Sequence, residues 1–339
     1  INNIWTQIGS DIDGEDANSF SGRSVSLSSD GNVVAIGADW NDGNGTDSGH
    51  VRIYKNVNNT WTQVGSDIDG EAAGDRSGWA VSLSADGTVV AIGATNNDSN
   101  GTDSGDGHGH VRIYQNVNNT WTQVGSDIDG ESADDLSGTS VSLSSDGNVV
   151  AIGAYTNDGS GSDSGHVRIY QNVNNNWVQV GSDIDGEATE DSSGISVSLS
   201  SDGNVVAIGA PGNDGNGSNS GHTRVFQIDL DITAPNAPSS LSTSSLANDN
   251  TPIITGIAEA GSTVKLYNGS ILLGSATADN DGAFSITSSA LTDGNYSLKV
   301  TATDAAGNTS SLSSALSIKV NQNLITGDFE WAKLYGSSA

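Results

Sequence analysis

Short runs of alternating apolar and polar residues recur through the first two-thirds of this chain. In the first copy they predict strands at Trp5–Ile8, Ser24–Ser28, Val33–Ala38 and His50–Tyr54. Asp30-Gly31 lies between two of these runs and supplies the positive φ that a tight hairpin turn needs. No segment shows an apolar period of 3.6 residues, so the pattern predicts an all-β protein without helices.

This four-strand pattern occurs four times. A unit this short cannot bury its own apolar face, so we expect the copies to pack on one another. Four short antiparallel strands per copy are typical of a β-propeller blade. Each copy has a tryptophan near its start, and the copies occupy residues 1–57, 58–117, 118–173 and 174–230.

The two ends of the array each lack one strand of the pattern. The strand Trp5–Ile8 has no strand of the HVRIY type before it, and Thr223–Phe226 has no WTQ strand after it. We therefore predict that the two segments lie together and close a ring of four blades. The alternative is that the four copies belong to a larger ring.

A different composition begins after the Pro-rich hinge Thr233–Pro238. Residues 231–320 show the alternation and turn spacing of an Ig-like β-sandwich without a disulfide. Residues 321–339 are either a disordered tail or the start of a further repeat domain. The strands expected in the sandwich are Pro252–Ile257, Thr263–Tyr267, Ala283–Thr287, Tyr296–Ala302 and Ala315–Val320.

The composition narrows the possible partners. Lys+Arg is 11 and Asp+Glu is 41, giving a formal net charge of -30, which disfavours nucleic acid and anionic lipid. This charge either attracts Ca²⁺ or only keeps the protein soluble. With no cysteine there is no disulfide or thiolate site, and no apolar run is long enough for membrane insertion. The absence of methionine and of a signal peptide suggests a piece of a longer polypeptide with neighbouring domains, or a processed product.

Two acidic segments are candidate Ca²⁺ sites, because alternating oxygen ligands beside a glycine can converge on a hard cation. The alternative for both is a solvated turn whose side chains cap its own backbone. One is the loop that contains Asp42, Asn44 and Asp47. The other is the Asp-Ile-Asp-Gly-Glu segment, whose candidate ligands are Asp11, Asp13, Glu15, Asp67, Asp69, Glu71, Asp127, Asp129, Glu131, Asp183, Asp185 and Glu187.

Other side chains recur in register or depart from the consensus. The repeated histidines (His50, His110, His166, His222) are expected to be structural, because a catalytic residue is normally unique among copies. Each repeated arginine (Arg52, Arg112, Arg168, Arg224) needs a carboxylate partner, which the Asp-Ile-Asp-Gly-Glu segment can offer. Trp40 and Tyr155 interrupt the consensus and are either a glycan-stacking platform or ordinary packing.

Two resemblances follow from these motifs. The run SGxSVSLSxDGxxVAIGA followed by GHVRIY resembles the FG-GAP repeat of integrin alpha subunits and bacterial surface proteins, most closely at Ile208–Pro211. The family usually forms seven-bladed propellers, and its alternating-acid Ca²⁺ loop is replaced here by a short Ser-Asp-Gly turn. Residues 258–264, 279–284 and 301–308 resemble the Ig-like modules of large bacterial adhesins. That resemblance implies junction calcium at Asp231, Asp281 and Asp304.

The sequence thus predicts a β-propeller of four repeats joined to an Ig-like sandwich. We expect a non-enzymatic, secreted or cell-surface protein that is stabilised by Ca²⁺ and binds a cell-surface or matrix glycan or a protein ligand. The alternatives are the targeting region of a larger secreted enzyme that acts on polysaccharide, and a structural spacer. A non-consensus cluster on one face of the propeller would favour ligand binding, whereas four identical faces would favour the spacer.

Overall fold

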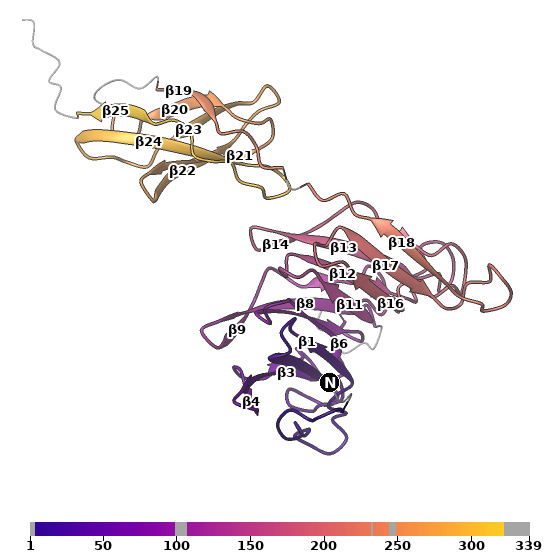
Figure 1. Ribbon diagram of the computed structural model, residues 1–339. Helices are drawn as coiled ribbons and strands as arrows, with labels where there is room; N and C mark the ends of the chain where they lie inside the picture. Colours follow the sequence, from indigo (N-terminus) through magenta and orange to yellow (C-terminus); the bar gives the residue numbers. More distant parts are fainter. Residues whose placement is uncertain (1–3, 99–106, 232, 244–248, 322–339) are drawn as a thin grey trace, which may run out of the picture. The chain divides into compact units, whose positions relative to one another are not determined.

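The computed structural model describes residues 4–98, 107–231, 233–243 and 249–321 (Figure 1). The chain divides into two compact units, Ile1–Leu230 and Asp231–Ala339, and each is described here by itself. All elements of the described residues are strands, which confirms the all-β prediction. None of these residues forms a helix long and apolar enough to cross a bilayer. The possible further repeat at residues 321–339 lies almost entirely outside the described residues.

The first unit contains four antiparallel sheets, each with its main strands side by side in chain order. The first sheet contains β1 (Ser24–Leu27), β2 (Val33–Ala38), β3 (His50–Val57), β4 (Thr60–Gln63) and the short β5 (Ile68–Asp69), which also pairs with β3. The second and third sheets repeat this order with β6 (Ser77–Leu83), β7 (Val89–Ala94), β8 (His110–Val117), β9 (Thr120–Gln123) and β10 (Ile128–Asp129), and with β11 (Ser140–Leu143), β12 (Val149–Ala154), β13 (His166–Val173), β14 (Asn176–Gln179) and β15 (Ile184–Asp185). The fourth contains β16 (Ser196–Leu199), β17 (Val205–Ala210) and β18 (His222–Gln227).

The tryptophan strand of each copy belongs to the sheet of the copy before it. Asn58 and Asn59 connect β3 to β4 with φ angles of 53° and 62°. Two left-handed residues form the turn that matches the twist of a hairpin, and asparagine tolerates this conformation. Each of the first three blades therefore ends with two strands of the following copy, the tryptophan strand and the short strand after it.

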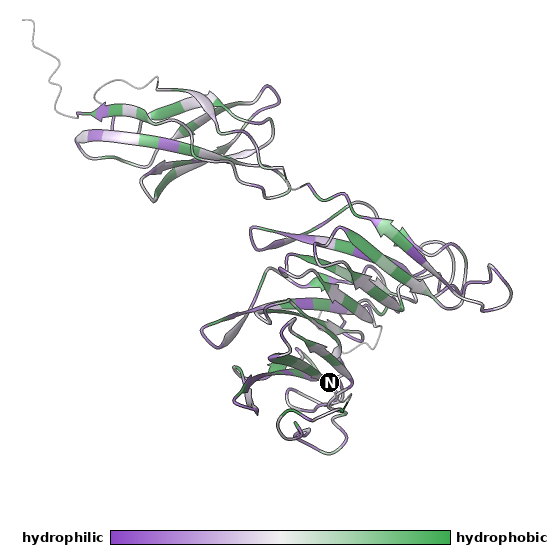
Figure 2. Cartoon of the chain, viewed as in Figure 1, coloured by the Kyte–Doolittle hydropathy of each residue, from purple (hydrophilic) through white to green (hydrophobic). Residues whose placement is uncertain are grey.

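The sheets stack face to face in chain order (Figure 1). Strands β1 and β2 lie against β6, β6 and β7 lie against β11, and β11 and β12 lie against β16. A separate apolar cluster fills each junction, and hydrophobic residues are concentrated on these strands (Figure 2). Gly37 is required at the first junction, because a Cβ there would lie 2.0 Å from the carbonyl oxygen of Gly78.

The predicted closure of the ring is wrong for the described residues. Trp5–Ile8 forms no strand, and β18 pairs only with β17. At the first sheet Leu27 is 59% exposed, whereas the equivalent Leu83 is 7% exposed. At the last sheet Val225 is 65% exposed, whereas the equivalent Ile169 is 3% exposed. Each end sheet is thus covered on one face, and the array is an open stack of propeller-type blades.

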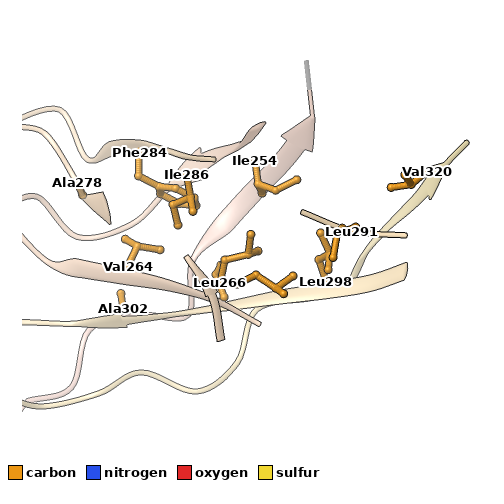
Figure 3. Close-up of a cluster of buried hydrophobic side chains, with 12 residues drawn as sticks. Ile254, Val264, Leu266, Ala278, Phe284, Ile286, Leu291, Leu298, Ala302 and Val320 are labelled. Atoms are coloured by element: carbon orange, nitrogen blue, oxygen red, sulfur yellow. The ribbon is translucent and has the colours of Figure 1, made fainter. Parts of the chain in front are cut away.

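The second unit is a two-sheet sandwich. One sheet contains β19 (Ser239–Thr243), β20 (Ile253–Ile257) and β23 (Ala283–Thr287), and the other contains β21 (Thr263–Asn268), β22 (Ile271–Thr277), β24 (Gly294–Thr303) and β25 (Leu316–Val320). Alternate side chains from both sheets, including Ile254, Leu266, Phe284 and Leu298, form one core between them (Figure 3). Strands β19 and β22 were not predicted from the sequence.

Candidate functional site

The Asp-Ile-Asp-Gly-Glu segment does not gather its carboxylates into one loop. In the second copy, Asp67 lies beside His50 of the first sheet, and Glu71 lies beside His110 of the second. Between them, Asp69 uses its backbone oxygen to accept a hydrogen bond from Arg112, at 2.6 Å. Each segment therefore joins two neighbouring sheets.

A cluster of one histidine and two carboxylates results at each of three positions. In the first, His50 Nδ1 lies 3.9 Å from Glu15 Oε2 and 3.9 Å from Asp67 Oδ2. The histidine begins β3, and the two acids come from the Asp-Ile-Asp-Gly-Glu segments of successive copies. The ligand atoms of each cluster lie within 4.8 Å of one another, in the groups Glu15–His50–Asp67, Glu71–His110–Asp127 and Glu131–His166–Asp183.

The outer oxygen of each carboxylate in the first cluster is held by a further side chain. Arg52 Nη1 lies 3.4 Å from Glu15 Oε1, and Gln63 Nε2 donates to Asp67 Oδ1. This leaves the inner oxygens, Oε2 and Oδ2, directed at the histidine. The same arrangement recurs in the other two clusters, with Arg112 and Gln123, and with Arg168 and Gln179. Three of the four repeated arginines thus pair with a carboxylate of this acidic segment, as predicted, whereas Arg224 donates to the backbone oxygen of Asp185.

The histidines of the clusters lie almost entirely inside the protein. His50, His110 and His166 are each 1% exposed. Burial lowers the pKa of His110 to about 4, and the nearby Arg112 acts in the same direction. Burial likewise lowers the pKa of His50 and of His166. All three rings are therefore neutral at physiological pH, which is the protonation state of a metal ligand.

The fourth copy holds only two of the three groups. His222 Nδ1 lies 3.6 Å from Glu187 Oε2, but its side chain is 25% exposed. Among the described residues no second carboxylate completes a cluster around His222. The reason is that the second acid of each cluster comes from the following copy of the repeat, and the fourth copy is followed by the second unit.

Sequence reasoning assigned these histidines a strand-start role and did not connect them with the acids. They do begin strands, and they also contact the acids. The sequence does contain a pattern that points to the clusters, because Glu, His and Asp recur at nearly constant offsets in successive copies. It was obscured because the three residues come from two copies and meet only when the sheets stack.

The predicted calcium ligands of the loop after β2 make hydrogen bonds of two kinds. Asp42 Oδ1 accepts from the backbone N–H of Asp47 at 2.8 Å. Asn44 Nδ2 donates to the backbone oxygen of Gly70 at 2.8 Å, so its side chain ties the loop to the next copy. The Asp42 contact is that of the capped turn, which was the alternative to a calcium site.

Two of the three predicted ligands in the second unit are linked. Asn308 Nδ2 donates to the backbone oxygen of Asp231 at 2.9 Å and to Asp304 Oδ2 at 3.0 Å. Asp281 lies in the turn before β23, where its backbone N–H donates to Asp279 Oδ1 at 3.0 Å. The entry of the second unit is therefore tied to the segment after β24 through Asn308.

A second candidate site departs from the repeat consensus. Its backbone is formed by equivalent turns of the first two copies, which hold Phe20 and Arg76 in the left-handed region with φ angles of 51° and 57°. The Phe20 ring contacts the Trp40 ring edge-on at 5.6 Å, and the Arg76 guanidinium lies 4.5 Å from the Trp40 ring centre. Trp40 remains 38% exposed.

The same patch continues through a second arginine. Arg23 lies 3.8 Å from the ring centre of Trp79, and its Nε is 3.9 Å from Asp39 Oδ2. Asp39 is 1% exposed; burial raises its pKa, and the charge of Arg23 opposes that shift. We call Phe20, Arg23, Asp39, Trp40, Arg76 and Trp79 the aromatic–arginine patch. The equivalent residues of the third and fourth copies, in the same order, are Leu136, Thr139, Tyr155 and Thr156 of the third and Ser192 and Ile195 of the fourth.

Trp40 and Tyr155, which were predicted to form one stacking platform, follow strands of different sheets. Trp40 comes after β2 of the first sheet, and Tyr155 comes after β12 of the third. The second sheet lies between these two sheets. The structure groups Trp40 with Phe20 and Arg76 instead.

Comparisons with solved structures give distant likenesses. Periplasmic gluconolactonase of Pseudomonas aeruginosa is 12% identical with a TM-score of 0.35, over 88% of this chain and 85% of that one. The Dos1 propeller is 13% identical with a TM-score of 0.37, over 82% of this chain and 63% of that one. TolB of Agrobacterium tumefaciens is 11% identical with a TM-score of 0.35, over 87% of this chain and 80% of that one. No curated protein matches the chain.

Family models match two adjoining regions. Residues 183–226 match the FG-GAP repeat, and residues 224–322 match the bacterial Ig-like domain. The first region covers most of the fourth copy, from its Asp-Ile-Asp-Gly-Glu segment to β18, and the second covers the sandwich. Both resemblances seen in the sequence are confirmed. The chain therefore carries a segment that matches the FG-GAP repeat, followed by a region that matches the bacterial Ig-like domain.

Proposed function

We propose that this chain is the ligand-binding region of a non-enzymatic protein of the cell surface or the extracellular space, and that it binds an acidic glycan through the aromatic–arginine patch. FG-GAP repeats followed by an Ig-like domain support a repeat protein that binds a ligand. The aromatic–arginine patch is the observation that carries the proposal. It breaks the repeat consensus where an architectural role would need identical residues.

The chemistry of the patch suits a sugar that carries carboxylate or sulfate groups. The exposed rings of Phe20 and Trp40 can cover the apolar face of a sugar at little conformational cost. Arg23 and Arg76 supply positive charge in a chain with a net charge of -30 and 11 basic residues. Guanidinium groups bind such anions through paired hydrogen bonds.

The test is an array of neutral and acidic glycans probed with wild type, Trp40→Ala and Tyr155→Ala. We expect wild type to bind acidic glycans, Trp40→Ala to lose at least about tenfold in affinity, and Tyr155→Ala to bind as wild type does, since Tyr155 lies two sheets away. Circular dichroism spectra of the three proteins control for folding. No binding by wild type, or unchanged binding by Trp40→Ala, contradicts the proposal.

Calcium belongs to the same proposal as a stabilising counter-ion of the acidic loops. The net charge of -30 makes the folded chain repel itself, and a cation that binds only the folded state stabilises it by mass action. We expect millimolar Ca²⁺ to raise the melting temperature relative to EDTA at equal ionic strength, with Mg²⁺ as the control for screening. Identical melting curves in Ca²⁺ and EDTA would exclude this role.

A further inference from the structure

We propose that the three Glu–His–Asp clusters at the sheet junctions bind divalent transition-metal ions, with one ion in each cluster. This inference is independent of the aromatic–arginine patch, which lies on other residues. It shares its carboxylates with the calcium proposal but adds a buried histidine to each site and selects another kind of ion.

The first argument is convergence. In the third cluster, His166 Nδ1 lies 3.9 Å from Glu131 Oε2 and 3.8 Å from Asp183 Oδ2. Two ligands of one tetrahedral ion lie about 3.4 Å apart when each is about 2.1 Å from the metal. The observed separations exceed this by roughly half an ångström, so small side-chain rotations would complete the coordination.

The second argument is an unpartnered atom in the third cluster. His166 is 1% exposed, and its Nδ1 has no hydrogen-bond partner among the described residues. That nitrogen is the atom directed at the two carboxylate oxygens. A buried polar atom without a partner is costly, and a bound ion would remove the cost.

The third argument is the support around the ligands. Arg168 Nη1 lies 3.8 Å from the outer oxygen of Glu131, and Gln179 Nε2 donates to the outer oxygen of Asp183 at 2.6 Å. Carboxylates that bind a metal through one oxygen are commonly oriented through the other. Arg168 adds a positive charge beside the site, and the two carboxylates together with a divalent ion balance to a neutral set.

The ligand set selects the class of ion. One imidazole nitrogen with two carboxylate oxygens suits Zn²⁺, Mn²⁺ or Co²⁺, with water in the remaining positions. Calcium needs six to eight oxygen ligands and gains little from an imidazole. We therefore use Zn²⁺ as the probe.

The fourth copy provides a built-in control. His222 has a glutamate partner but lacks the second carboxylate within the described residues, and its ring is more exposed. The proposal therefore predicts three tightly bound ions per chain, although four histidines occupy equivalent positions.

The experiment is equilibrium dialysis of the full chain, without an oligohistidine tag, against Zn²⁺ in excess Ca²⁺, with bound metal counted by elemental analysis. We expect three Zn²⁺ per wild-type chain, two per Glu71→Gln and three per His222→Gln. The Glu71 side chain is 44% exposed, so Glu71→Gln is expected to fold. His110→Gln should also bind two, and its circular dichroism spectrum checks the fold.

Three results would overturn the proposal. The first is wild type that retains no Zn²⁺ in the presence of Ca²⁺. The second is Glu71→Gln that retains as much Zn²⁺ as wild type. The third is His222→Gln that loses as much as Glu71→Gln, because the ions would then follow exposed histidines and acids rather than the complete clusters.

Discussion

Three of the tryptophans that mark the repeat link neighbouring copies through a hydrogen bond. Trp121 Nε1 donates to the backbone oxygen of Val64 at 2.8 Å, and its ring lies against Gly65, where a Cβ would approach it to 2.9 Å. Trp61 and Trp177 make the same hydrogen bond to the copies before them. Trp5 is 100% exposed. The repeated tryptophan therefore joins two copies at three of its four positions, whereas the first is exposed to solvent.

This difference gives a matched pair of variants. We expect Trp121→Phe to lower the stability of the first unit by about 1 kcal/mol, because the phenyl ring keeps most of the packing and loses the hydrogen bond. Trp5→Phe should leave stability unchanged. Urea unfolding followed by circular dichroism measures both. Equal changes in the free energy of unfolding for the two substitutions would show that the hydrogen bond of the Trp121 indole does not stabilise the contact between the sheets.

The buried histidines predict how stability depends on pH. The pKa of His110 is about 4 in the folded protein and 6.5 for a free histidine, so the unfolded chain binds the proton first. The stabilisation is fully present above pH 6.5 and is lost as the pH falls towards 4. His50 and His166 shift in the same direction.

We expect the melting temperature of wild type, measured in EDTA, to fall between pH 7 and pH 5. The melting temperature of His110→Gln should fall less steeply over the same range. Arg112, Glu71 and Asp127 surround this ring, and burial raises the pKa of the Glu71 carboxyl. His222→Gln is the control, because its ring is partly exposed. A slope in His110→Gln equal to that of wild type would contradict the linkage.

At the scale of elements, the pattern of apolar and polar residues predicted some strands with their bounds. Val33–Ala38 and Ala283–Thr287 have the predicted bounds. Trp5–Ile8 has the sequence of a strand but forms none, because the other WTQ strands pair through a hairpin with the strand before them. Strand β19 was missed because Ser-Ser-Leu-Ser-Thr shows no apolar face, and its pairing with β20 decides its conformation.

The candidate sites could be predicted only in part, because each of them combines residues from two copies of the repeat. Each acid of the clusters was identified, but as a calcium loop closed within five residues. In the structure Asp67 contacts a histidine of the first sheet and Glu71 contacts a histidine of the second. The reason is that β5 lies along β3 and the chain then passes to the next blade. The aromatic–arginine patch likewise joins turns of two copies, so Trp40 was visible as an exception to the consensus but its contact with Arg76 was not.

At the scale of the first unit, the open stack implies unequal stability along the array. The strands β7 and β12 are buried throughout, whereas β17 alternates between buried and half-buried residues because one face is uncovered. Stability in repeat arrays is a sum of unit terms and nearest-neighbour interfaces, so sheets with one neighbour are weaker than sheets with two.

We expect hydrogen exchange to report this difference directly. Backbone amides of β2 and β17 should exchange faster than those of the equivalent β7 and β12, by at least about tenfold, because local opening costs less at the ends. Mass spectrometry of exchanged peptides measures all four strands in one experiment. Uniform protection across the four sheets would indicate that the end faces are covered in solution.

The sharing of each acidic segment between two sheets constrains how such an array can grow. Asp67 serves the histidine of one blade and Glu71 serves that of the next, so the segment is complete only with a blade on either side. Duplication of one whole period inside the array adds one full cluster and preserves its neighbours, whereas duplication of part of a period disrupts two. A duplication that preserves every cluster must therefore copy one full period of the repeat. An array built by this rule holds one cluster fewer than its aligned histidines, as the three clusters and four histidines of the described residues do.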